Sequence, residues 1–514
     1  MGTFFMGVIL AIGFGYSIID MLKLEGYEIG LFILFTLVVF FFLNGMKRKV
    51  IDNREYYLSP LYASSIANFN QQTGIRWTRK ADVLSKGDVY IDNYRYNFDV
   101  KRRFSVLHEL LFSKTKKMYK ESLAFTRGSL IIGSMGSGKT VFINTLLLQS
   151  FYIRALIHDI KGDFVEKIYN RGNDIILNPF DKRGQVWDIF SEAENFPKII
   201  DSFFDTLLTG VMGGNNEGNK SFFTSSAKDR FVKIFMKAHN LDLDSKEKWK
   251  IAIEMLKAYE IEVAESTQKS EKDIYSTMKL LLEYIEFIGF LVIKGAKIFT
   301  IQQFLESKNC KLFLLNNPTY SEFLTPYFSA FIDSFTKIFM AKMPETKEDF
   351  TLLMLDEYLS FLPLLNEQTK TILHTLIRSK GGLLVPAIQY LPEHKNLRQQ
   401  LLNSAENMYI FQTSDIATVQ AIKDLIGKVE YRTESENETL KSTNKSYSTT
   451  IQYLLGDNTL KEIGKKYEHI TFVQSNQNLY LGYTPMTEQE KINSPFVEGY
   501  YKKFINLKFK REAE

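Results

Sequence analysis

The chain has 514 residues, 45% hydrophobic and 24% charged, a composition ordinary for a well-packed protein large enough for three or four domains. Its single cysteine excludes an intrachain disulfide framework and any zinc site built on paired thiolates. The formal net charge of +5 is too small to indicate a nucleic-acid-binding protein by itself.

The first 46 residues have the pattern of a membrane hairpin. Residues 3–19 and 29–46 contain no charged side chain, and a helix of that length spans about 26 Å, close to the hydrocarbon core of a bilayer. The connection at 20–28 is polar, and basic residues follow at 47–49. Because positive residues mark the cytoplasmic ends of spans, we expect two transmembrane helices and a cytoplasmic remainder. The alternative is a pair of buried soluble helices.

A complete phosphate-binding pattern, G-S-M-G-S-G-K-T, follows the apolar strand expected at 129–132 and precedes an apolar helix expected at 141–150. Glycines let the backbone wrap a phosphate with its N–H groups inward, and the helix N-terminus adds partial positive charge. We therefore expect ATP here, with Lys139 on the β- and γ-phosphates and the Thr140 hydroxyl on Mg²⁺. The expected nucleotide contacts are Gly133, Ser134, Met135, Gly136, Ser137, Gly138, Lys139 and Thr140.

A second apolar strand, at 350–357, ends in two carboxylates. Asp356 suits the magnesium side of a nucleotide site, and Glu357 suits the general base that orients the attacking water. Taken alone, this pattern equally describes a strand that runs into a helix cap. The phosphate-binding pattern upstream favours the catalytic interpretation.

A third element combines a helix at 366–380, a Gly-Gly stop and a strand at 383–388 that ends at Gln389. A strand end in this position of a P-loop sheet lies beside the γ-phosphate, which makes Gln389 a candidate sensor. Pro386 is awkward inside a central strand, because it has no N–H to donate, and a bulge or a late strand start would accommodate it. Arg378, in the last helical turn, either complements the helix dipole or serves as an arginine finger for a neighbouring subunit.

The sequence between these motifs predicts the domain order. Strands at 155–157 and 174–177 continue the α/β pattern, helical periodicity dominates from about 196 to 306, and a strand at 312–315 resumes the sheet. We predict an α/β, RecA-like P-loop NTPase domain in two parts, 123–195 and 309–505, with an all-α insertion at 196–308. The hairpin at 1–46, a membrane-proximal extension at 47–122 and a solvated tail at 506–514 complete the chain. Residues 432–450 are expected to form a mobile loop or an exposed strand pair, and His158 is interpreted as structural.

Three further motifs resemble the coupling proteins of type IV secretion, the TraD-like conjugation ATPases. They are D-I-K-G-D at 159–163, L-N-P-F-D-K-R-G-Q-V-W at 177–187, and Arg-Ser-x-Gly at 378–381 leading to Gln389. The resemblance covers residues 1–430. It implies a homo-hexameric ring at the inner membrane that brings a DNA–relaxase complex to the secretion channel and moves DNA with ATP and Mg²⁺. It also implies that Gln389 is the sensor and Arg378 the finger acting in trans.

The chain departs from this family pattern in three places. The connection between the spans is short, Asp163 stands where a glutamate is common, and no long acidic tail follows. Basic residues at 102–103 and 114–120 suit DNA phosphates or, more simply, a solvated or lipid-facing surface. The alternatives are a motor for protein effectors without a DNA role and a nucleotide-gated membrane scaffold. An ABC transporter is disfavoured, because its signature sequence is absent.

Overall fold

The computed structural model describes residues 128–148, 152–212, 219–344, 349–360, 362–439 and most of 442–504, together with short strands at 76–77, 89–91 and 118–120. The predicted membrane hairpin, most of the predicted extension and the tail lie outside these residues. Within the described part, no helix is long and apolar enough to cross a bilayer. The chain forms two compact units, and the larger comprises residues 71–94, 114–430 and 450–514.

The larger unit is built on a ten-stranded sheet of order β1-β16-β15-β12-β4-β11-β10-β5-β9-β6. All pairings from β12 to β6 are parallel, and β15 pairs antiparallel with both β12 and β16. This confirms the predicted α/β fold with a mainly parallel sheet. The strands are β1 Arg76–Trp77, β4 Ser129–Ile132, β5 Arg154–Asp159, β6 Ile175–Leu177, β9 Cys310–Leu315, β10 Thr351–Leu355, β11 Gly382–Ile388, β12 Asn407–Ile410, β15 Glu468–Val473 and β16 Asn478–Tyr483.

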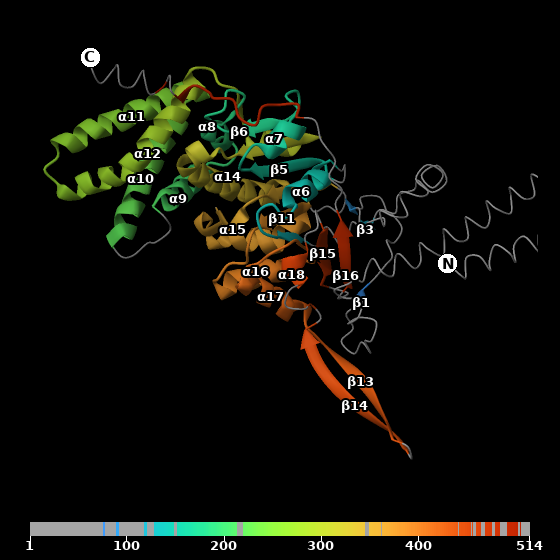
Figure 1. Ribbon diagram of the computed structural model, residues 1–514. Coiled ribbons are helices and arrows are strands. Elements are labelled where there is room, and N and C mark those ends of the chain that lie inside the picture. The colour runs from blue at the N-terminus through green and yellow to red at the C-terminus, as the bar shows by residue number, and fades with distance from the viewer. Residues whose placement is uncertain are drawn as a thin grey trace, which may run out of the picture. The chain divides into compact units, whose positions relative to one another are not determined.

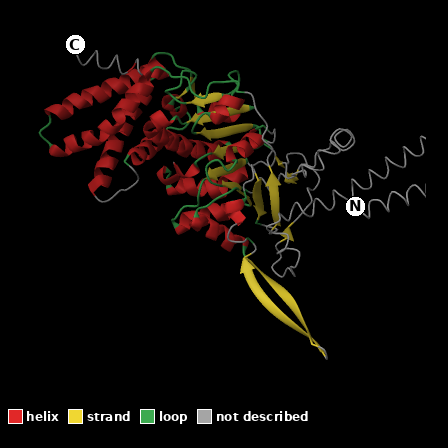
Figure 2. Ribbon diagram, in the orientation of Figure 1, coloured by secondary structure: helices red, strands yellow, loops and turns green. Residues whose placement is uncertain are grey.

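Helices cover both faces of the sheet, as the continuous apolar runs of its parallel strands require. On one face, α6 (Lys139–Leu147) and α7 (Asp163–Ile168) pack on a core that includes Ala155 and Ile157 of β5. Because side chains alternate along a strand, His158 points to the other face, where its ring meets Phe328 of α14 (Ser321–Lys342). Figures 1 and 2 show these helices around the strands.

The described part of the stretch predicted to be all-α, 196–308, is mainly helical. Its helices are α9 Ile199–Val211, α10 Asn219–His239, α11 Ser245–Glu265, α12 Lys269–Ile293 and α13 Ile301–Glu306, and the short α8 Ile189–Ala193 precedes them. Buried polar anchors attach them to the rest of the unit: the Trp249 indole donates to Asp188 at 2.8 Å, and the Ser202 hydroxyl donates to Asp333 of α14 at 2.7 Å. The structure adds one short strand here, β8 (Ile298–Phe299), which pairs with β7 (Val186–Trp187).

The single helix predicted at 366–380 is a composite. It starts as α15 (Glu367–Thr371), passes through a π-helical turn at Ile372–Leu376 and ends as a 3-10 turn at Ile377–Lys380. Gly381, with φ of 79°, closes it as the Gly-Gly stop predicts.

Strand β11 starts early and contains Pro386 without a bulge. Pro386 is in register with Leu355 of β10, whereas pairing with β4 starts one residue later, at Ala387 and Ile131. A proline is compatible with that arrangement, because it has no N–H to offer β4.

Residues 432–439 and 442–450, most of which belong to the smaller unit, form part of the strand pair β13 (Lys428–Thr439) and β14 (Ser442–Tyr453), one of the two alternatives expected for them. The larger unit also contains the strands β2 Val89–Ile91 and β3 Met118–Lys120, the 3-10 turns Pro318–Tyr320, Tyr358–Ser360 and Leu362–Leu364, and the helices α16 Lys395–Ser404, α17 Ile416–Ile426 and α18 Thr459–Glu462.

Candidate nucleotide site

The phosphate loop connects β4 to α6 and is held by the strands on either side. The Gly133 N–H donates to Ile388 of β11 at 3.1 Å, and the Ser134 N–H donates to Gln412, just past β12, at 2.8 Å. Gly136 and Gly138 take the left-handed conformation, with φ of 77° and 105°. Since other residues adopt it only with strain, the glycines of the pattern are required for this path of the backbone.

The loop offers donors and no acidic side chain. Helix α6 has no side-chain cap and no acidic residue in its first turn, and the N–H groups of that turn point toward the loop. The Ser137 hydroxyl is buried and finds no partner among the described residues. Thr140 is half-buried, and Met135 is exposed. This donor set fits a phosphate chain, whose oxygens would accept from helix N–H groups and from the Ser137 hydroxyl.

Lys139 is folded back on its own loop. Its ammonium donates to the carbonyl of Gly133 and, at 3.2 Å, to that of Ser134. Burial lowers the pKa of Lys139, while the carboxylates of Glu357 and Asp356 oppose that shift. The cation is therefore already oriented within the loop, with two carboxylates near enough to stabilise its charge.

The acidic turn, residues 356–357, follows β10 directly. Glu357 has φ of 48°, a left-handed conformation that costs a non-glycine residue roughly 1–3 kcal/mol and that is concentrated at functional sites. Buried His158 holds the turn from the neighbouring strand, because its Nδ1 lies 2.6 Å from the carbonyl oxygen of Asp356. Burial lowers the pKa of His158 to about 4, so the ring is neutral and donates from Nδ1. This contact supports the prediction that His158 has a structural role.

The surroundings of Asp356 disfavour the charged form of its carboxyl group. Burial is the main cause that raises the pKa of Asp356 to about 7, the Glu357 carboxylate adds to it, and the Lys139 ammonium lowers it. A divalent cation would reverse this balance. A carboxylate and a threonine hydroxyl are hard oxygen donors of the kind that Mg²⁺ prefers, so Asp356 and Thr140 fit that metal.

Gln389 lies at the end of β11, the strand between β4 and β10. Its side-chain amide donates to Glu357 Oε1. Parallel strands end at the same edge of a sheet, which is how residues from three motifs far apart in sequence meet here. The structure therefore brings together Lys139, Asp356, Glu357 and Gln389. Arg378 is exposed in the 3-10 turn Ile377–Lys380 and is not part of this group of contacts among the described residues.

Sequence reasoning left Asp159 without a role. Its buried carboxylate accepts the N–H groups of Gly162, Phe164 and Val165, each at 2.9 Å, and so caps α7 beside the acidic turn. Burial raises the pKa of Asp159 to about 6. The sequence signal that could have predicted this cap is an aspartate three residues before the glycine at the N-cap of a helix.

A histidine with two hydrogen-bonding contacts links the acidic turn to the composite helix, and the sequence analysis did not predict it. Buried Tyr358 follows Glu357, and its hydroxyl lies 3.1 Å from Nε2 of His374 in the π-helical turn. Nδ1 of His374 lies 3.0 Å from the Ser404 hydroxyl. Burial lowers the pKa of His374 to about 4. The π turn thus places a neutral histidine where it can bridge two hydroxyl groups, and such turns often occur at functional sites.

This histidine should make the protein sensitive to acid. The folded-state pKa of His374, about 4, lies below the ordinary value of 6.5. The unfolded chain therefore takes up the proton first, and the stabilisation present above pH 6.5 is lost as the pH falls toward 4. We expect His374→Gln to reduce the loss of unfolding free energy over that interval by up to about 3 kcal/mol. Urea unfolding at several pH values measures it, and parallel curves for the two proteins would contradict the assignment.

The strand, the glycine-rich loop, the helix and the acidic turn together define a P-loop nucleotide-binding fold. The chain belongs to the family of type IV secretion-system coupling proteins, because the sequence model described as the DNA-binding domain of these proteins matches residues 121–454. This confirms the family resemblance found in the sequence.

Individual relatives agree with this family. The chain is 27% identical to the coupling protein TraD of Escherichia coli strain K12 over 223 residues, which are 39% of this chain and 29% of TraD. Among solved structures, the unbound conjugative coupling protein TrwBdeltaN70 matches with a TM-score of 0.57 and 17% identity, over 81% of this chain and 100% of that one. TrwB with ADP and Mg²⁺ matches with a TM-score of 0.56 and 19% identity, over 74% and 90%. At these identities the structures show a shared fold.

Proposed function

We propose that this chain is the coupling ATPase of a conjugative type IV secretion system, which recruits a DNA–relaxase substrate and drives DNA through the channel by ATP hydrolysis. The observation that carries the proposal is the convergence of Lys139, Asp356, Glu357 and Gln389 at one edge of the sheet. A nucleotide-binding scaffold has no need of a carboxylate held by an amide beside the phosphate loop.

The nucleotide would lie along the phosphate loop, as it does in TrwB structures with an ATP analogue or with ADP and Mg²⁺. Lys139 would exchange its contacts to loop carbonyls for the phosphates, and the Ser137 hydroxyl would gain a partner. Thr140 and Asp356 would hold Mg²⁺, which supplies charge neutralisation at the phosphates. The proposed nucleotide contacts are Gly133, Ser134, Met135, Gly136, Ser137, Gly138, Lys139 and Thr140.

The other groups have separate tasks. Glu357 orients the attacking water and accepts its proton, while the amide of Gln389 fixes the carboxylate in place. The backbone carbonyl of Asp356 accepts a hydrogen bond from His158, which fixes the position of the acidic turn. Arg378 is exposed, as a finger for the nucleotide of a neighbouring subunit in a homo-hexamer must be.

The predicted domains complete this proposal. Residues 1–46 anchor the chain in the inner membrane and 47–122 extend from it. The motor consists of 123–195 and 309–505, the helices at 196–308 form the insertion that faces incoming substrate, and 506–514 is a tail. The expected partners are DNA, a relaxase, the secretion channel, membrane lipid and other copies of the chain.

DNA should stimulate the enzyme. We expect ATP turnover by the full chain in detergent to rise about fivefold or more with saturating DNA, the lower end of typical coupling between two sites. The stimulation should weaken as salt increases, because phosphate contacts release counterions. Turnover is measured with single- and double-stranded DNA, and Lys139→Ala is the background control.

An assembled chain that hydrolyses ATP and ignores every form of DNA would contradict the DNA role. Crosslinking of residues 196–308 to an effector protein in cells, with none to DNA, would then favour the protein-export alternative. Turnover no faster than background would refute the motor itself.

A further inference from the structure

The C-terminal strap, residues 491–501, crosses the larger unit without forming a long helix or strand. Its hydrogen bonds go to other elements instead. The N–H groups of Ile492 and Asn493 both donate to the carbonyl of Glu166 in α7 at 3.0 Å. The Asn493 amide donates to the carbonyls of Tyr169 at 2.9 Å and Val165 at 3.3 Å. The strap therefore begins by capping the C-terminal end of α7.

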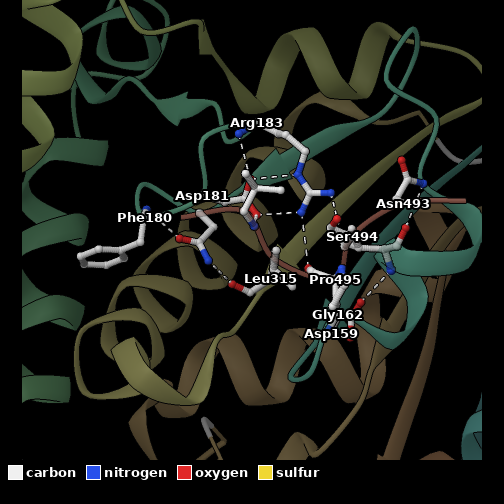
Figure 3. A network of polar contacts seen from close by, with 12 residues as sticks. Asp159, Gly162, Phe180, Asp181, Arg183, Leu315, Asn493, Ser494 and Pro495 are labelled. Carbon is white, nitrogen blue, oxygen red and sulfur yellow. Dashed lines mark hydrogen bonds and ion pairs between the residues drawn. The ribbon is translucent and has the colours of Figure 1, made fainter. Parts of the chain in front are cut away.

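Arg183, from the N-P-F-D-K-R-G motif, clamps the middle of the strap (Figure 3). Its Nη1 donates to the Ser494 carbonyl at 2.7 Å and its Nη2 to the Pro495 carbonyl at 3.4 Å. A two-pronged contact with buried Asp181, at 3.0 and 2.7 Å, fixes the guanidinium. Asp181 also accepts the N–H of Val497 at 3.0 Å. The sequence alone gave this motif no role. In the structure, its Asp181 and Arg183 hold the strap in place.

Two glycines show how closely the strap packs against the segments that it contacts. A Cβ added to Gly162 would lie 2.4 Å from the Pro495 carbonyl oxygen, and one added to Gly499 would lie 2.6 Å from that of Phe180. The Gly499 N–H donates to the same Phe180 oxygen at 2.7 Å. Close-packed contacts of this kind transmit displacement, because neither side can move without the other.

One end of this contact reaches the nucleotide site. Gly162 begins α7, and its N–H is held by the Asp159 carboxylate at 2.9 Å. Asp159 follows His158 in β5, and His158 binds the carbonyl of Asp356. A continuous series of contacts therefore connects the acidic turn to Pro495 through the end of β5 and the start of α7.

The other end reaches the long helix α12. The Tyr501 hydroxyl donates to the Glu283 carboxylate, and the Tyr501 ring packs on Phe287, with ring centroids 5.0 Å apart. Phe504, just past the strap, contacts Phe287 and Phe290 with centroids 5.3 and 5.4 Å away. The strap is thus attached to α12 by one hydrogen bond and an aromatic cluster.

We propose that the C-terminal strap is a mechanical link, clamped by Arg183, through which nucleotide binding at the acidic turn displaces α12. This inference rests on the proposed function, because nucleotide binding is its input. It assigns the N-P-F-D-K-R-G motif to coupling. Arg183 is then a positioning residue, outside the group of residues proposed to contact the nucleotide.

Hydrogen–deuterium exchange of the full chain in detergent, with and without a non-hydrolysable ATP analogue, tests the link. In the unaltered chain, analogue binding should change exchange in both the strap and α12. Arg183→Gln should speed strap exchange about tenfold or more by opening it locally, leave the dissociation constant of the analogue within about twofold, and abolish the response of α12. Arg171→Gln, at an exposed arginine, is the matched control.

A second pair of variants guards against a misfolded Arg183→Gln chain. Tyr501→Phe removes only the hydroxyl that binds Glu283, so the strap should still respond to the analogue while the response of α12 falls. Tyr500→Phe, at an exposed neighbour, should match the unaltered chain. If analogue binding changed hydrogen–deuterium exchange in α12 of Arg183→Gln and Tyr501→Phe as much as in the unaltered chain, the link would be overturned. It would also be overturned if the unaltered chain bound the analogue without any change of exchange in α12. A chain that binds no analogue would instead refute the proposed function, and the link with it.

Discussion

Lys139→Ala is expected to lower ATP turnover by about 10²- to 10³-fold, the usual loss when one preorganised charge is removed from a transition state. Lys139 is the cation of the phosphate loop, oriented by the carbonyls of Gly133 and Ser134. Because its ammonium also lowers the pKa of Asp356, the variant should hold Mg²⁺ less tightly at neutral pH. Steady-state turnover across a magnesium series measures both effects.

The control for this variant is Lys237→Ala, at an exposed lysine on α10. It should keep full turnover and the same magnesium dependence. A Lys139→Ala chain that hydrolyses ATP at the unaltered rate would refute the assignment of the phosphate loop, and with it the identity of the motor.

Glu357→Gln is expected to separate binding from hydrolysis. The substitution is nearly isosteric and leaves the loop, Lys139 and Asp356 in place, so analogue affinity should change by less than about threefold. Turnover should fall about 10²- to 10⁴-fold, because the amide cannot accept a proton from water. The Gln389 amide would also lose the carboxylate that it now contacts.

Equilibrium binding of a fluorescent ATP analogue and single-turnover hydrolysis give the two quantities separately. Glu254→Gln, at an exposed position on α11, is the matched control and should change neither. Loss of binding in step with turnover would show that Glu357 supports the fold of the turn, and retained turnover would remove it from the chemistry.

The sequence predicts the strands at the centre of the sheet well, and there is a physical reason. Buried parallel strands are continuous apolar runs, and polar side chains are concentrated where they end, so the pattern predicts that Asp356 and Gln389 lie at one edge of the sheet beside the phosphate loop. The antiparallel extension by β15 and β16 was missed. Strand β16 pairs with β15, but β15 joins the sheet by pairing with β12, a distant segment of the chain, and no local period reports that pairing.

Two further features were beyond sequence reasoning. The π turn that carries His374 has the same apolar spacing as an α-helix over its five residues, so periodicity cannot reveal it. Much of the contact with the strap uses its backbone N–H and carbonyl groups, which nearly every residue has. Contacts made through the backbone leave little trace in residue identity.

The order of strands in the sheet also determines when, during translation, the phosphate loop gains its neighbouring strands. Strand β4, which carries the phosphate loop, is flanked by β11 and β12, and β12 is translated about 280 residues after it. At roughly 5–20 residues per second, the ribosome needs about 15 to 55 s to supply that neighbour. During this interval the loop has no strand on that side and lacks the Gln412 carbonyl that accepts the Ser134 N–H in the finished protein. The phosphate loop of a nascent chain therefore takes its final conformation only after residues as far as 412 have been made.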